Sequence, residues 1–177
     1  MNKKGTTKNL VLMALFAALT AVLAQIMLPA GPVVFNLAVL GAFLAGMLLP
    51  PSAAAGSMLV YFLMALVGLP VLAGFTGGPG ILFGSTGGYV VGYVCIALAT
   101  AWGARRGLWQ TVLGMAVGMA LCYGLGTVWF MAVTGSGLTE SLGWCVLPFL
   151  LPDAAKGAGA LVLGRVLNDR LAKAGVR

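Results

Sequence analysis

The stretch Leu147-Pro-Phe-Leu-Leu-Pro-Asp-Ala-Ala-Lys-Gly157 places an acidic and a basic residue at the front of a long apolar segment. The whole sequence has only three acidic residues: Glu140, Asp153 and Asp169. If Pro152 opens a helix, where its missing N–H is not needed, Asp153 and Lys156 share one face. Charges in an apolar segment usually face a partner or a cavity. The pair therefore either binds a small polar group or neutralises itself and anchors a helix end at the lipid–water interface.

The composition indicates a membrane protein. Of the 177 residues, 61% are hydrophobic and 7% are charged, and the mean hydropathy is +1.07, whereas soluble domains average about 25% charged residues. The apolar runs lack the alternation of barrel strands, so we expect an all-α integral membrane protein. There is no His, and the three Cys lie singly in separate apolar segments. We therefore expect no metal, no cofactor and no disulfide.

Six apolar segments, separated by breaks rich in Pro, Gly or polar residues, predict six transmembrane helices in a single membrane domain over residues 1–177. The expected spans are approximately 10–28, 33–49, 53–69, 86–102, 109–133 and 148–167. The first run is long enough to span a bilayer and lacks a convincing cleavage site, so we interpret it as a helix and not as a signal peptide. A Gly-rich loop over 68–85 and a Gly/Ser/Thr loop over 134–143 connect later spans.

The basic residues predict the orientation. They cluster at both termini and in the loop between the fourth and fifth spans: Lys3, Lys4, Lys8, Arg105, Arg106, Arg165, Arg170, Lys173 and Arg177. With six spans all these positions lie on one side, and Lys and Arg mark the cytoplasmic side of a cell membrane. Both termini are thus expected to be cytoplasmic. The net charge of +7 is an orientation signal and does not indicate nucleic-acid binding. The two loops and the Asp153–Lys156 pair then face outward, as a receptor for an external solute requires.

The Gly-rich loop is not a nucleotide site, since residues 74–88 contain no Lys and follow no predicted strand. We expect no ATPase site and no enzymatic activity. The loop is either a lid over an outward pocket or a flexible connector. Ionisable groups are essentially absent from the middle of the spans, and six short helices are few for a complete alternating-access carrier. The chain is therefore expected to work as part of a larger assembly.

Small residues recur at helical spacing on two spans. On the fifth, Gly114 and Gly118 are interpreted as internal packing. On the first, two overlapping pairs let another helix approach closely, either inside the bundle or from a separate membrane subunit. These residues are Ala14, Ala17, Ala18 and Ala21.

Two motifs resemble a known family. Phe75-Thr-Gly-Gly-Pro-Gly-Ile-Leu-Phe-Gly-Ser-Thr-Gly-Gly-Tyr-Val-Val-Gly-Tyr93 resembles the loop and fourth helix of the BioY proteins. Gly124-Leu-Gly-Thr-Val-Trp-Phe130, followed by Val146-Leu-Pro-Phe-Leu-Leu-Pro-Asp-Ala-Ala-Lys156, resembles their fifth and sixth helices. The family's usual Gly-Pro-Thr-Gly-Gly is Gly84-Ser-Thr-Gly-Gly88 here, which bears on the rigidity of the turn. BioY proteins are the biotin-specific S components of energy-coupling factor (ECF) transporters.

The resemblance implies a six-helix S-component fold that binds biotin with high affinity near the outer face. It implies that Asp153 and Lys156 are ligand contacts. From the donors and acceptors of biotin, we expect Asp153 to accept from a ureido N–H and Lys156 to donate to an oxygen of the ligand. The loop over Phe75–Gly88 would enclose the ligand, with further contacts from Phe75, Gly84, Ser85, Thr86, Tyr89 and Trp129. The alanine face of the first helix would meet the coupling subunit EcfT (BioN-like), and two ATPase subunits (EcfA- or BioM-like) would supply energy. The alternatives are a structural or assembly subunit without a ligand, and an S component for thiamine or riboflavin.

Overall fold

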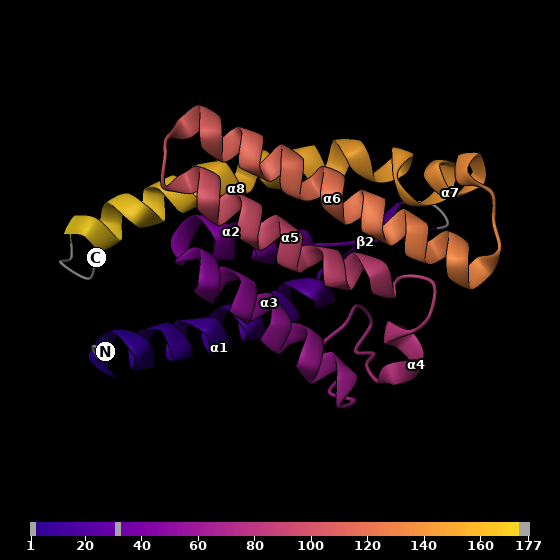
Figure 1. The fold of residues 1–177 in the computed structure, drawn as a ribbon, viewed down its shortest axis with the longest axis horizontal. Coiled ribbons are helices and arrows are strands. Elements are labelled where there is room, and N and C mark those ends of the chain that lie inside the picture. The colour runs from indigo at the N-terminus through magenta and orange to yellow at the C-terminus, as the bar shows by residue number, and fades with distance from the viewer. Residues whose placement is uncertain (1–2, 31–32, 174–177) are drawn as a thin grey trace.

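The computed structural model describes residues 3–30 and 33–173. Within these ranges the chain forms eight helices and one antiparallel two-stranded hairpin (Figure 1). The elements in chain order are α1 Lys3–Gln25, β1 Met27–Ala30, β2 Val33–Asn36, α2 Ala38–Leu48, α3 Pro51–Leu66, α4 Pro79–Leu82, α5 Gly87–Ala104, α6 Leu108–Thr134, α7 Leu138–Cys145 and α8 Leu147–Lys173.

The β-hairpin corrects the prediction that helices extend over residues 26–28 and 33–37. Helix α1 ends at Gln25, and the next segment pairs with Val33–Asn36 in a register that sets Met27 opposite Asn36. Pro29 explains the break, because proline disrupts a helix but is tolerated in a two-stranded ribbon, where every strand is an edge.

Two short helices and the start of α8 also differ from the prediction. Helix α4 lies inside the predicted Gly-rich loop, and α7 occupies most of the predicted Gly/Ser/Thr loop. Helix α8 begins at Leu147, so Pro152 lies inside the helix and does not open it. Pro148 instead lies in the first turn, where a missing N–H leaves no helical bond unmade.

Three of the described helices are long and apolar enough to cross a bilayer: residues 7–25 of α1, α5 and α6. The consecutive helices α7 and α8 are bent by 41° and together qualify as a fourth candidate. Helices α2 and α3 are apolar but shorter, at 11 and 16 residues. The expected class, an all-helical bundle with membrane-spanning segments, is confirmed at this level, with the hairpin as its only described strands.

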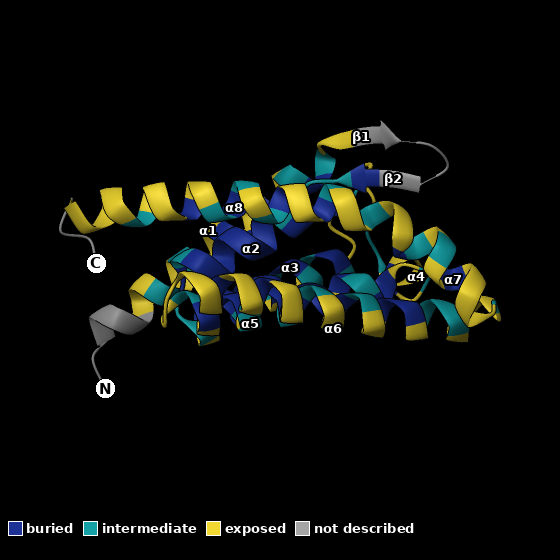
Figure 2. Cartoon of the chain, turned by 90° about the horizontal axis from the view of Figure 1, so that it is seen from above, coloured by how far each residue is buried: buried dark blue, intermediate teal, exposed yellow. Residues whose placement is uncertain are grey.

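Helix α2 lies at the centre of the bundle and packs on α1, α5 and α8. Nine of its residues are buried, and Figure 2 shows it between α8 and the layer formed by α5 and α6. The outward faces of α1, α6 and α8 carry exposed Leu and Val side chains. An apolar outer face over a packed interior is the pattern that a lipid environment allows.

Helices α5 and α6 pack closely through small residues. A Cβ added at Gly118 would lie 2.8 Å from the Cα of Ile96, and a Cβ at Gly114 would collide with the carbonyl oxygen of Ala99. Both obstacles are backbone atoms, which cannot rotate away. The prediction that Gly114 and Gly118 serve internal packing is confirmed.

Replacing Gly118 by Ala is therefore expected to lower the melting temperature by several degrees, since overpacking costs about 1–3 kcal/mol. Gly124 on the same helix is the matched control, because a Cβ there meets no atom of the described structure within 4 Å. Gly124→Ala should leave the melting temperature unchanged or raise it, because Ala favours a helix over Gly by up to about 1 kcal/mol. Equal effects in a thermal melt would contradict the close approach.

Candidate functional site

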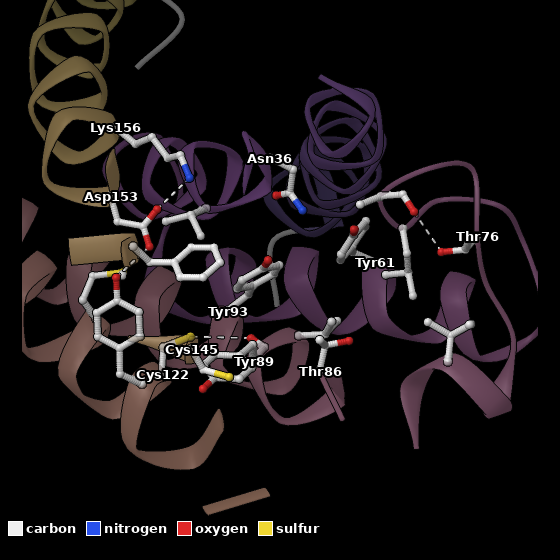
Figure 3. A pocket seen from close by; sticks show the side chains of 18 residues that line it. Asn36, Tyr61, Thr76, Thr86, Tyr89, Tyr93, Cys122, Cys145, Asp153 and Lys156 are labelled. Atoms are coloured by element: carbon white, nitrogen blue, oxygen red, sulfur yellow. Dashed lines mark hydrogen bonds and ion pairs between the residues drawn. The ribbon is translucent and has the colours of Figure 1, made fainter. Parts of the chain in front are cut away.

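A cavity of about 320 Å³ opens among α5, α6, α8, the end of β2 and the Gly-rich loop. Its volume falls in the range of small-ligand pockets, roughly 300–1,000 Å³. Apolar and aromatic side chains dominate the lining, with a few polar groups among them, as such pockets usually show. The residues labelled in Figure 3 are Asn36, Tyr61, Thr76, Thr86, Tyr89, Tyr93, Cys122, Cys145, Asp153 and Lys156.

An ion pair lies at one end of the cavity. Lys156 Nζ donates to Asp153 Oδ1 at 2.6 Å, and both side chains are buried, at 8% and 5% exposure. The hydroxyl of Tyr123 on α6 donates to the other oxygen, Asp153 Oδ2, at 2.8 Å. The predicted common face of Asp153 and Lys156 is confirmed. Tyr123 was not predicted, because an aromatic residue in a long apolar span gives no signal of its partner.

The ion pair retains hydrogen-bonding capacity. Each carboxylate oxygen of Asp153 has a further lone pair, and the ammonium group of Lys156 has further N–H donors. Because the two charges cancel, the pair suits a neutral ligand group that offers N–H donors beside a carbonyl oxygen. Within the described residues no group of three His, Cys, Asp or Glu side chains could hold a metal ion.

Two uncharged donors lie farther along the cavity. The Tyr93 side chain is 8% exposed, and its hydroxyl has no hydrogen-bond partner among residues 3–30 and 33–173. Asn36 accepts the N–H of Ala38 at 3.0 Å through its side-chain oxygen, which leaves its NH₂ group for a ligand. Figure 3 shows Asn36 and Tyr93 between the ion pair and the two labelled threonines. Sequence reasoning missed both.

Of the predicted loop residues, Thr86 and Tyr89 line the cavity. The Tyr89 hydroxyl is 3.3 Å from Thr127 Oγ1. Gly84, Ser85 and Trp129 lie outside the lining. Instead, the indole N–H of Trp129 donates to the Gly84 carbonyl at 2.9 Å. Trp129 thus attaches α6 to the turn that leads into α5.

Phe75 also lies outside the cavity lining, with its side chain 72% exposed and a φ of +56°. Its backbone N–H donates to Gln25 Oε1 at 2.8 Å. The amide nitrogen of Gln25 donates to the carbonyls of Leu72 at 2.9 Å and Val71 at 3.3 Å. Gln25, at the end of α1, therefore joins the Gly-rich loop to the bundle. A single amide at the end of an apolar helix was the only sequence signal for this role.

The four predicted alanines of α1 face in different directions. Ala17 is fully buried and Ala21 is partly buried, so this pair packs within the bundle, where α1 contacts α2 and α3. Ala14 and Ala18 are exposed. Only the second pair presents small side chains on the outer surface.

Known proteins resemble the chain over nearly its whole length. A "Probable biotin transporter BioY" of Pyrococcus horikoshii is 36% identical and aligns over 91% of this chain and 96% of its own length. A "Biotin transporter BioY" of Rhizobium etli is 33% identical, covering 92% and 94%. A crystal structure of "the S-component for biotin from an ECF-type ABC transporter" superposes with a TM-score of 0.84 at 26% identity, covering 96% and 95%. Residues 1–173 match the family described as BioY, and the chain belongs to the BioY family.

Proposed function

We propose that this chain is the biotin-binding S component of an ECF-type importer. It captures biotin at the outer face with high affinity and delivers it inward together with an ATPase-driven coupling module. The observation that carries the proposal is the buried Asp153–Lys156 pair at the end of a ligand-sized cavity, within a fold similar to that of a biotin S component.

The chemistry of biotin fits the two ends of this pair. The ureido ring has two N–H donors and one carbonyl acceptor. Asp153 accepts from a ureido N–H, and Lys156 donates to the ureido oxygen. The fused rings are apolar, and Tyr61, Tyr93 and Phe149 supply aromatic surface along the cavity for them.

Tyr123 positions the carboxylate of Asp153 in this arrangement. Tyr123→Phe removes one hydrogen bond to Asp153 and leaves the ring in place. We expect biotin to bind about 3- to 10-fold more weakly, since a hydrogen bond to a charged group contributes about 1.5–3 kcal/mol and part of this is recovered when the carboxylate reorients. Titration of labelled biotin measures the change. Unaltered affinity would mean that Tyr123 has no part in the site.

The proposal places six spans in the cell membrane, with both termini in the cytoplasm. Helices α1, α5 and α6 are three of these spans, and the short helices α2 and α3 are two more. Helices α7 and α8 together form the sixth. The distribution of Lys and Arg supports this orientation. Of the basic residues used, Arg177 lies outside the described residues.

The proposed partners are the coupling subunit EcfT and two ATPase subunits. The exposed pair Ala14 and Ala18 supports a contact between α1 and the coupling subunit, because small residues let helices approach closely. The sequence contains no phosphate-binding loop motif, which supports a role as a non-enzymatic binding subunit. In this mechanism the loop closes over biotin, and the S component then rotates in the bilayer to release it inward. Accumulation of biotin against a gradient by the purified chain alone in vesicles would refute the dependence on partners.

A thermal-shift panel tests the ligand class. The purified chain is heated with biotin, thiamine or riboflavin, each at the same concentration. We expect biotin alone to raise the melting temperature, because a ligand that binds only the folded state stabilises it. A response to one of the other vitamins would change the assigned ligand. A response to none would favour a structural subunit, in which the Asp153–Lys156 pair only holds helices together.

A further inference from the structure

The cavity contains one cationic side chain. Among the described residues that line the cavity, Lys156 is the only Lys or Arg. The next cation on α8 is Arg165, nine residues or about 14 Å farther along the helix. Arg105 follows the 18-residue helix α5, whose length separates it by about 27 Å from the first turn of α5 beside the cavity. A ligand that carries an acid group therefore has no second cation available to it.

Lys156 is already engaged by Asp153. A ligand carboxylate on the same ammonium group would bring two anions to one buried cation and leave a net negative charge in an apolar site. Uncompensated buried charge is strongly unfavourable. A neutral ureido group fits this end of the cavity without that penalty, so the acid group of the ligand belongs at the other end.

The other end is uncharged and accessible to water. Thr76 and Thr86 line the cavity and are both exposed, and Figure 3 shows them away from the ion pair. Hydroxyl groups and water can hydrogen-bond a carboxylate there while it keeps most of its hydration. Between the two ends, the Asn36 amide and the Tyr93 hydroxyl offer further neutral donors.

This inference rests on the proposed function. We propose that this protein selects the ureido head of biotin and binds the acid tail with uncharged donors and water at the mouth of the cavity, the exposed end beside Thr76 and Thr86. The ligand class is then ureido-ring compounds with a charged or an uncharged tail. Biotinamide, which replaces the carboxylate by a neutral amide, is expected to be a ligand of nearly the same affinity as biotin.

Equilibrium binding of biotin and biotinamide to the detergent-purified chain, at one pH, tests the proposal. A charged hydrogen bond contributes about 1.5–3 kcal/mol, which corresponds to roughly 10- to 150-fold in affinity. Without such a bond, biotinamide should bind at most about fivefold more weakly than biotin. A larger loss would overturn the inference, because it would require a cation at the acid group. Failure of both ligands to bind would instead refute the proposed function.

Charge variants at the mouth give a second readout that does not depend on absolute affinity. The Thr86 side chain makes no capping hydrogen bond to α5, so its replacement removes no such contact. Thr86→Lys should shift the preference toward biotin over biotinamide by about two- to fivefold, and Thr86→Asp should shift it the other way, since exposed charge pairs contribute about 0.2–1 kcal/mol. A preference that is the same in both variants would show that the acid group lies elsewhere.

Discussion

Replacing Asp153 by Asn is expected to weaken biotin binding by a factor of about ten or more. The change keeps the shape of the side chain but removes its negative charge. The carboxylate that it replaces accepts hydrogen bonds from Lys156 at 2.6 Å and from Tyr123 at 2.8 Å. The variant loses a charge-assisted bond to the ureido ring, worth about 1.5–3 kcal/mol. It also leaves the Lys156 ammonium group buried without its anion, which disturbs the second ligand contact.

Asp169→Asn is the matched control for this variant. Asp169 lies on the same helix, α8, but is exposed, so the identical chemical change there should leave affinity unaltered. Both variants are titrated with labelled biotin after a check that each elutes as a single folded species. Wild-type affinity in Asp153→Asn would remove Asp153 from the ligand contacts and return the pair to a structural role.

Replacing Gln25 by Met is expected to accelerate the dissociation of biotin by about five- to tenfold. Met has a similar length but cannot donate to the carbonyls of Val71 and Leu72 or accept from the N–H of Phe75. Each lost neutral hydrogen bond contributes about 0.5–1.5 kcal/mol. The Gly-rich loop should then open more often, while the ion pair and the remaining cavity lining stay intact.

The kinetic form of this result separates the loop from the pocket. A loosened loop raises the dissociation rate and changes the association rate little, as measured by stopped-flow mixing and chase with unlabelled biotin. Gln110→Met is the control, because Gln110 is the only other glutamine and is exposed on α6. Dissociation at the wild-type rate in Gln25→Met would exclude a lid role for the Gln25-anchored loop.

The ion pair could be predicted because its geometry is local. Asp153 and Lys156 are three residues apart in one apolar segment, and any helix through them sets them side by side. Tyr123 could not be predicted, since it meets Asp153 across 30 positions of sequence. That contact depends on how α6 and α8 sit relative to each other.

The β-hairpin and α7 were missed for different reasons. Residues 27–30 and 33–36 are short and mostly apolar, and such runs suit a strand or a helix end equally. Only the pairing of these two segments with each other distinguishes a strand from a helix end here. Helix α7 begins after a segment rich in Gly, Ser and Thr, which reads as a loop, although Leu138 and Leu142 have helical spacing and Glu140 lies in the first turn.

Some predicted site residues act through the backbone of their neighbours. Trp129 was expected to contact the ligand, yet its indole N–H donates to the Gly84 carbonyl and the residue lies outside the cavity lining. Sequence motifs identify residues that gather near the Gly-rich loop. They do not distinguish a residue that lines the cavity from one that supports the lining. Asn36 illustrates the converse, because its place on a hairpin brings an unremarkable residue into the cavity.

The most direct test of the account is equilibrium binding of labelled biotin to the detergent-purified single chain, without any partner subunit. The account predicts tight, saturable binding by this chain alone, since Asp153, Lys156 and the other cavity-lining residues all belong to it. If well-folded protein binds neither biotin nor thiamine nor riboflavin, the receptor function is contradicted. The buried ion pair would then be only a structural contact between helices.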